Sequence, residues 1–316
     1  MSNKKPLIIL TGPTAVGKTN LSIKLAKAVD GEVISADSMQ VYRGMDIGSA
    51  KIKPEEMQGV RHHLIDILEP WEEFNVVVFQ QKCRECLQDI YDRGHIPILT
   101  GGTGFYIQAV LKEVDFTENE DNNEYRMYLE KLGEEKGPKV LHDMLRQVDP
   151  VSAEAIHANN RKRVIRALEF YHFTGQRISE HNEKEAQKEA AYNFCYFVLN
   201  DERSILYDRI EKRVDLMMEQ GLTEEVRELA KKGCKRNMVA MQGLGYKEIM
   251  DYLDGKISLE EAVYIIKRDT RHFAKRQITW FKREKDVIWL NRPEFENDDE
   301  KLLLFMLDKL KEKEIL

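Results

Sequence analysis

Hydrophobic positions follow two alternating patterns in the first hundred residues of the chain. Apolar runs of four to six residues, typical of buried strands, occur at residues 6–10, 33–36, 63–68 and 96–99. Between these runs the apolar residues recur at helical spacing, at Leu21, Leu25 and Ala28 and again within residues 75–92. Because strands that alternate with helices form parallel sheets with crossover helices, we predict an α/β fold.

The pattern changes near residue 115. Residues 115–123 are acidic and loop-like, and helical spacing then continues to an almost wholly polar stretch at 181–190. Strand character returns at residues 194–199, helical spacing dominates residues 203–285, and a last strand is expected near residues 287–290. We therefore predict a parallel sheet flanked by helices, built from residues 1–114 and 193–316, with a helical insertion domain at residues 115–192.

A phosphate-binding motif follows the first apolar run. Eight consecutive residues fit G-x-x-x-x-G-K-[ST] at every fixed position: Gly12, Pro13, Thr14, Ala15, Val16, Gly17, Lys18 and Thr19. The motif lies between a strand and a helix, where glycines let backbone N–H groups turn towards a phosphate and Lys18 adds a full charge. Thr19 is placed to bind Mg²⁺. The loop predicts a P-loop NTPase-like sheet that binds a polyphosphate, either a nucleotide or a diphosphate ester.

Charge is distributed unevenly along the chain. The formal net charge is −6, yet residues 161–166 carry four basic side chains and no acid, and residues 267–285 are strongly basic. Local basic patches favour polyanion binding more than the net sum opposes it, although most basic helix faces are simply solvated. The two patches make nucleic acid a candidate partner.

The four cysteines and the apolar runs bear on the compartment. Four cysteines in 316 residues do not make a disulfide framework, so we expect a reducing cytoplasm. Cys83 and Cys86 form a C-x-x-C without a second pair or a histidine cluster, which favours buried thiols over a zinc site. No apolar run approaches the ~20 residues of a membrane helix. We expect a monomer with no membrane segment and no obligate protein partner.

Motifs along most of the chain resemble the tRNA dimethylallyltransferase (tRNA isopentenyltransferase) family. The resemblance extends over about residues 6–290 and is much more specific than the P-loop alone. The residues that carry it are Thr11–Thr19, Ser35–Tyr42, Gly44–Lys51, His62–Asp66, Gly101–Tyr106, Arg163–Glu169, Thr174–Gly175, Gln242–Glu248 and Arg271–Phe281.

The resemblance implies transfer of a dimethylallyl group from dimethylallyl diphosphate to the exocyclic amine of the adenine on the 3′ side of a tRNA anticodon. It implies that Asp37 is the general base, that the P-loop and Mg²⁺ bind the diphosphate, and that Arg213 and Thr103 contact substrate. A weak nucleophile such as an adenine amine benefits from a carboxylate that accepts its proton. The alternative for Asp37 is a carboxylate of the magnesium shell.

Further residues match the tRNA contacts of the family. The target base must leave its stack, which is easier in a single-stranded anticodon loop. The resemblance places Ser38, Met39 and Gln40 at this adenine and makes the helical insertion a tRNA-contacting domain. The remaining expected tRNA contacts are Thr103, Arg126, Arg161, Lys162, Arg163, Val164, Ile165, Arg166, Gln242, Gly243, Arg271, Lys275, Arg276 and Gln277.

Two other functions use some of the same residues. A P-loop kinase of a small metabolite or nucleoside would need the same cradle and could use Asp37 as its base, but it would not need the basic segment at residues 267–285. An ATP-gated RNA-binding protein would use that segment without group transfer. No long acid-ended strand clearly supplies the hydrolytic centre that this second alternative requires.

Overall fold

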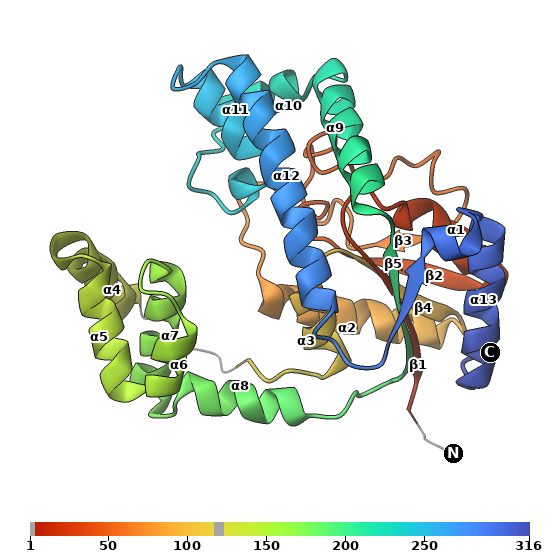
Figure 1. The fold of residues 1–316 in the computed structure, drawn as a ribbon, viewed down its shortest axis with the longest axis horizontal. Helices are drawn as coiled ribbons and strands as arrows, with labels where there is room; N and C mark the ends of the chain where they lie inside the picture. The colour runs from red at the N-terminus through yellow and green to blue at the C-terminus, as the bar shows by residue number, and fades with distance from the viewer. Residues whose placement is uncertain (1–3, 117–122) are drawn as a thin grey trace. The chain divides into compact units, whose positions relative to one another are not determined.

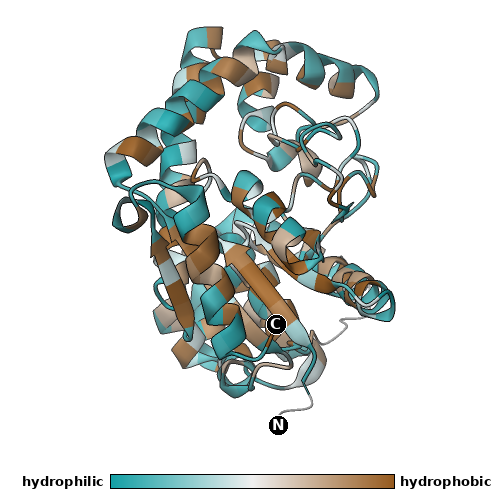
Figure 2. Cartoon of the chain, turned by 90° about the vertical axis from the view of Figure 1, so that its right-hand side faces the viewer, coloured by the Kyte–Doolittle hydropathy of each residue, from teal (hydrophilic) through white to brown (hydrophobic). Residues whose placement is uncertain are grey.

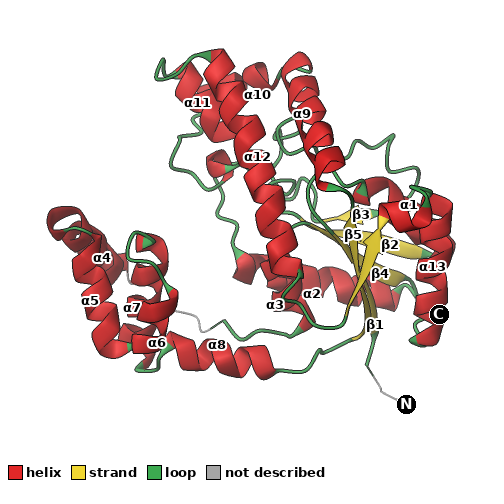
Figure 3. Ribbon diagram, viewed as in Figure 1, coloured by secondary structure: helices red, strands yellow, loops and turns green. Residues whose placement is uncertain are grey.

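The computed structural model describes residues 4–116 and 123–316. Its strands form one sheet in the order β3-β2-β4-β1-β5-β6, in which every neighbouring pair is parallel (Figure 1, Figure 3). The strands are β1 (Pro6–Thr11), β2 (Gly31–Ala36), β3 (His62–His63), β4 (Ile96–Gly101), β5 (Asn193–Asn200) and β6 (Val287–Asn291). The predicted parallel α/β fold is confirmed.

Helices connect the strands and occupy both faces of the sheet (Figure 1). Before β5 the helices are α1 (Lys18–Val29), α2 (Val76–Asp92) and α3 (Gly104–Leu111), followed, in a separate compact unit, by α4 (Asn123–Lys136), α5 (Pro138–Val148), α6 (Pro150–Ala155), α7 (Arg161–Thr174) and α8 (Ile178–Gln187). After β5 come α9 (Arg203–Glu219), α10 (Leu222–Lys231), the short η1 (Ala240–Gln242), α11 (Tyr246–Leu253), α12 (Leu259–Phe281), η2 (Arg292–Phe295) and α13 (Asp299–Glu312).

The main core lies between the sheet and the helices α1 and α13. Alternate residues of the strands, such as Ile8 and Leu10 of β1, pack there with Leu21 and Leu25 of α1 and Met306 of α13. The residues between them, such as Leu7 and Ile9, are also fully buried, so β1 is apolar on both faces. Figure 2 shows the strands as the most hydrophobic part of the sheet layer. This double burial explains why the first apolar run is continuous and not alternating.

One predicted strand is much shorter than expected. The predicted strand covered residues 63–68, but the strand β3 that pairs with β2 consists of His62 and His63 alone. Leu64 and Asp66 have φ angles of 60° and 53°, and a strand cannot continue through left-handed residues. The apolar run at residues 63–68 is therefore mainly a loop, which contacts the segment after β2 through backbone hydrogen bonds such as Ile67 N–H to the Val41 carbonyl at 2.9 Å and through a bridge between Tyr42 and Leu68.

The carboxyl ends of the central strands lie along one edge of the sheet. The phosphate-binding loop follows β1, Asp37 follows β2, and a double-glycine turn follows β4. The strand β5 runs into α9, so that α9 and the helices packed against it, α10 and α12, lie beyond this same edge (Figure 1). Open α/β sheets bind ligands at this edge.

The chain divides into two compact units, residues 1–111 with 191–316, and residues 112–190. The sequence placed these boundaries after residues 114 and 192. The second unit has its own small core, in which Leu129, Leu141, Leu145 and Leu168 are buried together. A buried carboxylate, Asp149, accepts hydrogen bonds from Ser152 and Ser179 and so joins α6 to the start of α8. The helical character predicted for this segment is confirmed for its described residues.

Candidate active site

The phosphate-binding loop has the backbone that its glycines predict. Gly12 and Gly17 have φ angles of 149° and 96°, and Ala15 between them has a φ of 65°. A Cβ on Gly12 would lie 2.2 Å from the carbonyl oxygen of Leu199 at the end of β5. Both glycines are therefore required, because the loop turns through left-handed conformations while packing against the neighbouring strand.

Arg292 supports this loop from behind. Its Nε donates to the carbonyl of Val16 at 2.9 Å, and its Nη1 pairs with Asp299 at 3.0 Å. The guanidinium lies so close that a Cβ on Gly17 would be 2.7 Å from its Nη2. Arg292 comes from η2, 275 residues after Gly17 in the chain (292 − 17), and no local motif in the sequence pointed to it.

Lys18 folds back over the loop. Its Nζ donates to the carbonyls of Gly12 and Pro13 at 3.0 and 2.8 Å. Burial and the positive charge of Arg213 together lower the pKa of Lys18 to about 7, although the negative charge of Asp37 acts in the opposite direction. A polyanionic ligand beside Lys18 would therefore strongly favour its protonated, positively charged form.

Asp37 is held by the backbone that follows it. Its Oδ1 accepts hydrogen bonds from the N–H groups of Met39 at 2.8 Å and Gln40 at 3.3 Å. Among the described residues no donor contacts Oδ2. One oxygen thus fixes the orientation of the carboxylate, and the other remains available as a base or as a metal ligand.

Gln40 differs from the expectation that its side chain reads a base edge. Its Oε1 accepts from Ser35 Oγ at 3.1 Å, and its Nε2 lies 3.4 Å from the carbonyl of Ala50. The side chain therefore braces the turn after β2 against the segment around Ala50. A base contact through this amide would first require these bonds to break.

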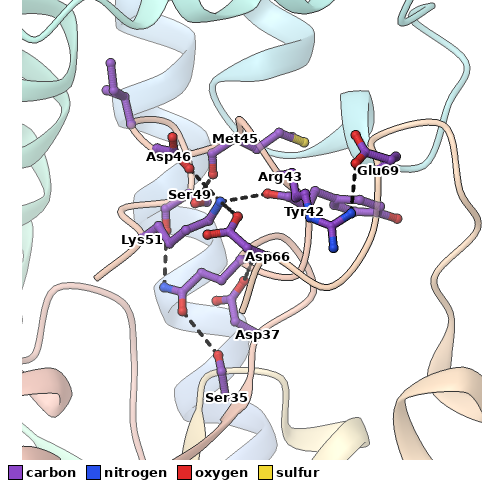
Figure 4. Close-up of polar contacts among 12 residues, drawn as sticks. Ser35, Asp37, Tyr42, Arg43, Met45, Asp46, Ser49, Lys51, Asp66 and Glu69 are labelled. Atoms are coloured by element: carbon purple, nitrogen blue, oxygen red, sulfur yellow. Dashed lines mark hydrogen bonds and ion pairs between the residues drawn. The ribbon is translucent and has the colours of Figure 1, made fainter. Parts of the chain in front are cut away.

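A buried lysine organises the same loop. Lys51 Nζ donates to the carbonyl of Tyr42 at 2.7 Å and pairs with Asp46 at 2.6 Å and Asp66 at 2.5 Å (Figure 4). Its side chain is only 5% exposed. Because three segments converge on one ammonium group, Lys51 fixes the loop that continues from Asp37. The sequence analysis quoted Lys51 within a motif but gave it no role.

The turn after β4 lies against the end of β2. A Cβ on Gly101 would be 2.3 Å from the carbonyl oxygen of Ala36, and the N–H of Thr103 bonds the same carbonyl at 3.4 Å. Thr103 then starts α3, since its own carbonyl accepts from Tyr106 and Ile107. Glycine at this point lets the turn approach β2 closely enough to bring Thr103 to the same cavity as Asp37.

A cavity of about 680 Å³ collects most of the predicted site residues. Arg213 lines it from α9, and solvent reaches this side chain although the surrounding protein lowers its pKa by desolvation. The other predicted residues in its lining are Thr14, Ala15, Gly17, Lys18, Thr19, Asp37, Ser38, Met39, Gln40, Thr103, Gln242, Gly243, Arg276 and Gln277. The structure therefore brings together the cradle, the carboxylate and the turn that the sequence identified separately.

A carboxylate on α10 joins two of the segments that line this cavity. Glu225 accepts hydrogen bonds from the backbone N–H groups of Asp46, Ile47 and Gly48 at 2.7–3.1 Å, and from Tyr246 Oη at 2.8 Å. Gly48 packs so closely on the Tyr246 ring that a Cβ would lie 2.6 Å from it. Glu225 was not predicted, because its partners are distant in the sequence.

The residues predicted to contact tRNA on the basic helix α12 differ in their exposure and in their partners. Arg271 pairs with Glu211 at 2.6 Å, Lys275 is exposed, and Arg276 lies over the Phe273 ring at 5.7 Å while lining the cavity. Gln277 is only 6% exposed and bonds protein atoms. Gln277 also lines the cavity, so the prediction that it contacts tRNA stays a prediction, and such a contact through its amide would first require these bonds to break.

The predicted tRNA residues of the second unit also divide into two kinds. Val164 and Ile165 are 0% and 5% exposed and belong to its hydrophobic core, so their predicted role as tRNA contacts is wrong. Lys162, Arg163 and Arg166 are exposed, and no described residue forms an ion pair with any of them. The remaining two are engaged: Arg126 with Glu169 through two bonds of 2.8 Å, and Arg161 with the Glu130 carbonyl at 3.1 Å.

All four cysteines are free, and burial raises the pKa of the thiols of Cys83 and Cys86. In the described part of the chain no histidine, cysteine and carboxylate side chains gather in a group of three that could hold a metal. Of the two thiols of the C-x-x-C, that of Cys83 is buried and that of Cys86 is partly buried. Residues 4–116 and 123–316 include no helix long and apolar enough to span a bilayer.

The fold and the site define an α/β protein in which a P-loop and an oriented carboxylate line the same cavity. The IPP transferase family model matches residues 40–284, and an isopentenyl transferase model matches residues 5–69. The chain therefore belongs to the IPP transferase family and is a prenyltransferase, as its motifs predicted.

Close relatives agree with this membership. The chain is 60% identical over 312 residues to a tRNA dimethylallyltransferase of Lachnoclostridium phytofermentans, covering 99% of both chains. A tRNA dimethylallyltransferase of Carboxydothermus hydrogenoformans is 52% identical over 92% of this chain and 93% of its own.

Solved structures show the same fold. The full-length tRNA isopentenylpyrophosphate transferase of Bacillus halodurans superimposes with a TM-score of 0.74 at 45% identity, with 98% of each chain covered. A eukaryotic dimethylallyltransferase acting on tRNA gives a TM-score of 0.79 at 32% identity over 91% of this chain and 74% of its own.

Proposed function

We propose that this protein transfers the dimethylallyl group of dimethylallyl diphosphate to the exocyclic amine of the adenine that follows the anticodon of a tRNA. The observation that carries the proposal is the shared cavity, which the P-loop lysine, the oriented carboxylate of Asp37 and the Thr103 turn all line. The names of the relatives support the choice of donor and acceptor.

The reaction forms one bond and breaks one. The adenine amine nitrogen attacks C1 of the dimethylallyl group, and the bond between C1 and the diphosphate oxygen breaks. The electron pair of that bond leaves with pyrophosphate, and a proton of the amine passes to Oδ2 of Asp37. Since Oδ1 is already held by two backbone N–H groups, the carboxylate needs no reorganisation to accept the proton.

Charge that develops on the leaving pyrophosphate meets two cations. Lys18 and Arg213 both line the cavity, and their proximity to each other is what lowers the pKa of Lys18 beyond the effect of burial. A diphosphate between them relieves this repulsion, so both side chains bind the donor and stabilise its departure. Thr103, in the turn after β4, lines the same cavity and is proposed as a contact of the donor or of the target base.

The donor set of the cavity fits Mg²⁺. Thr19 is exposed at the start of α1, where P-loop proteins bind the ion. The Thr100 hydroxyl is buried, lines the same cavity and has no hydrogen-bond partner among the described residues. Thr19 would hold the ion directly, and Thr100 would hydrogen-bond its water shell. When bound, Mg²⁺ neutralises charge on the diphosphate.

The exposed cations are proposed to grip the tRNA backbone. On α12, Arg276 lines the first unit's cavity and Lys275 is the exposed residue before it; in the second unit Lys162, Arg163 and Arg166 are exposed at the start of α7. A protein of net charge −6 binds a polyanion through such local patches. We further propose that the protein acts as a monomer in the cytoplasm, which suits its four free cysteines.

One assay separates this function from its rivals. Purified protein is mixed with labelled dimethylallyl diphosphate, Mg²⁺ and an unmodified tRNA transcript, and with a matched transcript that carries guanine in place of the adenine after the anticodon. Label should enter only the adenine transcript. In parallel, γ-labelled ATP is offered with nucleosides and with RNA. Phosphate transfer or hydrolysis without prenylation would support the kinase or the ATP-gated RNA-binding protein.

A further inference from the structure

Gln277 connects two segments of the active site through its side-chain amide. Its Oε1 accepts the backbone N–H of Thr14 in the P-loop at 2.9 Å, and its Nε2 donates to the carbonyl of Gly102 in the turn before Thr103 at 3.0 Å. These segments follow different strands, β1 and β4. The side chain that joins them belongs to a third element, α12.

The geometry around this amide is closely fitted. A Cβ on Gly102 would lie 2.1 Å from Gln277 Nε2, so the turn can receive the amide only because it has a glycine there. The reverse orientation of the amide would set its NH₂ group against the N–H of Thr14 and its oxygen against the carbonyl of Gly102. Both contacts therefore select the same orientation, and glutamine is the residue that supplies one acceptor and one donor at this reach.

The position of Gln277 on α12 relates it to the RNA-binding surface. Gln277 is buried on the same side of the helix as Ala274 and Phe281, whereas its neighbour Arg276 is exposed, and both Gln277 and Arg276 line the cavity. One helix thus carries a proposed phosphate contact and, at the next residue, the link to the donor cradle. A displacement of the helix would move both.

We propose that Gln277 is a positioning residue for the transfer reaction, one that sets the P-loop and the Thr103 turn at a fixed separation. The proposal rests on the proposed function, because it assigns the donor to the P-loop and a substrate contact to Thr103. It is an alternative to the expectation that Gln277 touches tRNA. The amide acts through Thr14 and Gly102 and touches no reacting atom.

The test compares Gln277→Met and Gln277→Glu with the wild-type protein. Methionine has a similar length and neither donates nor accepts strongly. Because small misplacements of reacting groups cost up to about a hundredfold in rate, we expect Gln277→Met to lower kcat by about ten- to a hundredfold. Its dissociation constant for tRNA should stay within about twofold of wild type. Gln81→Met is the matched control: Gln81 is exposed on α2, outside the cavity, and its substitution should change neither value.

Gln277→Glu adds a readout that a merely structural role would not move. An ionised glutamate still accepts from Thr14 but repels the carbonyl of Gly102, whereas a protonated glutamate both accepts and donates. The rate of this variant, divided by the wild-type rate at the same pH, should therefore rise as the pH is lowered. Gln277→Met should show no such rise.

Three outcomes would overturn the proposal. The first is a wild-type kcat in Gln277→Met. The second is weakened tRNA binding with unchanged kcat, which would make Gln277 an RNA contact after all. The third is an equal loss of rate in both variants at every pH together with a lowered Tm, which would mean a general folding defect.

Calorimetric titration of each variant with Mg²⁺ and pyrophosphate separates this proposal from the proposed function. If the wild-type protein binds pyrophosphate but prenylates no tRNA, the proposed function fails. Gln277 is then still tested by the affinity for pyrophosphate, which should fall in Gln277→Met and not in Gln81→Met. An affinity for pyrophosphate that is unchanged in both variants would mean that the Gln277 amide does not position the P-loop.

Discussion

Replacing Asp37 by asparagine tests the chemical step most directly. Asparagine keeps a side-chain oxygen that accepts the N–H groups of Met39 and Gln40, now 2.8 and 3.3 Å from Oδ1. It removes the negative oxygen that receives the proton. The turn should therefore keep its shape while the base is lost, which separates chemistry from folding.

The magnitude follows from the role. A positioned general base contributes typically about 10²- to 10⁴-fold, which corresponds to roughly 3–5 kcal/mol of barrier. Asp37→Asn should lower kcat within this range. Asp37→Ala should lower it by at least as much and also lower the Tm, because two hydrogen bonds of about 1 kcal/mol each lose their acceptor. Binding of tRNA should stay within about twofold of wild type in Asp37→Asn, since the phosphate contacts that dominate affinity are elsewhere.

Single-turnover measurements with labelled donor and saturating tRNA give the rate of transfer, and filter binding gives the affinity for tRNA. Titration with Mg²⁺ distinguishes the two roles considered for Asp37. A loss of rate that excess Mg²⁺ restores would identify Asp37 as a carboxylate of the metal shell. A loss smaller than about tenfold at saturating Mg²⁺ would refute general-base catalysis by this residue, given the expected contribution.

Three further results are expected. Lys18 has a pKa lowered to about 7 in the free protein and binds the donor when protonated, so kcat/KM for the donor should fall as the pH rises above about 7. Lys18→Met should raise the donor KM and flatten this pH profile. A wild-type profile in Lys18→Met would contradict the cradle assignment. Lys275→Ala combined with Arg276→Ala should weaken tRNA binding. The slope of log K for tRNA against log salt concentration should fall by the equivalent of about two phosphate contacts, with donor binding unchanged as the control. An unchanged slope would remove this part of α12 from the interface. Lys51→Met should lower kcat and the Tm, because two carboxylates lose their buried cation, and Lys51→Arg should recover part of both; a wild-type kcat in Lys51→Met would show that the loop after Asp37 needs no such anchor.

The sequence predicted those parts of the site that are encoded locally. The P-loop and Asp37 follow strands whose apolar runs are continuous, so their position at the carboxyl edge of the sheet could be inferred from the order of elements. Thr103 was found in the same way, after β4. The family resemblance supplied their roles, which the spacing of residues did not.

The supports of the site come from distant parts of the chain and left weaker signals. Arg292 and Glu225 bind backbone groups more than 170 residues away (292 − 16 = 276 and 225 − 46 = 179), and nothing in a local pattern pairs such residues. Gln277 was different, because it follows Ala274 by three residues and precedes Phe281 by four. That spacing marks the buried face of a helix and could have placed Gln277 inside. The same argument applies to Val164 and Ile165, which precede the buried Leu168.

The residues proposed for chemistry and those proposed for tRNA binding are held by different kinds of contact. The groups nearest the reaction are fixed to backbone atoms: Asp37 by two N–H groups, the P-loop by Arg292, and the Thr103 turn by the carbonyl of Ala36. Displacement at a flexible donor by a weak nucleophile requires this precision, because the reaction rate falls steeply when the reacting atoms are misplaced. By contrast, the exposed cations Lys275 and Lys162 have no ion-pair partner among the described residues, so their long side chains can adjust to an RNA backbone. Binding through adjustable charges and chemistry through fixed dipoles are thus assigned to different residues, and substitutions in the two sets should separate Kd for tRNA from kcat.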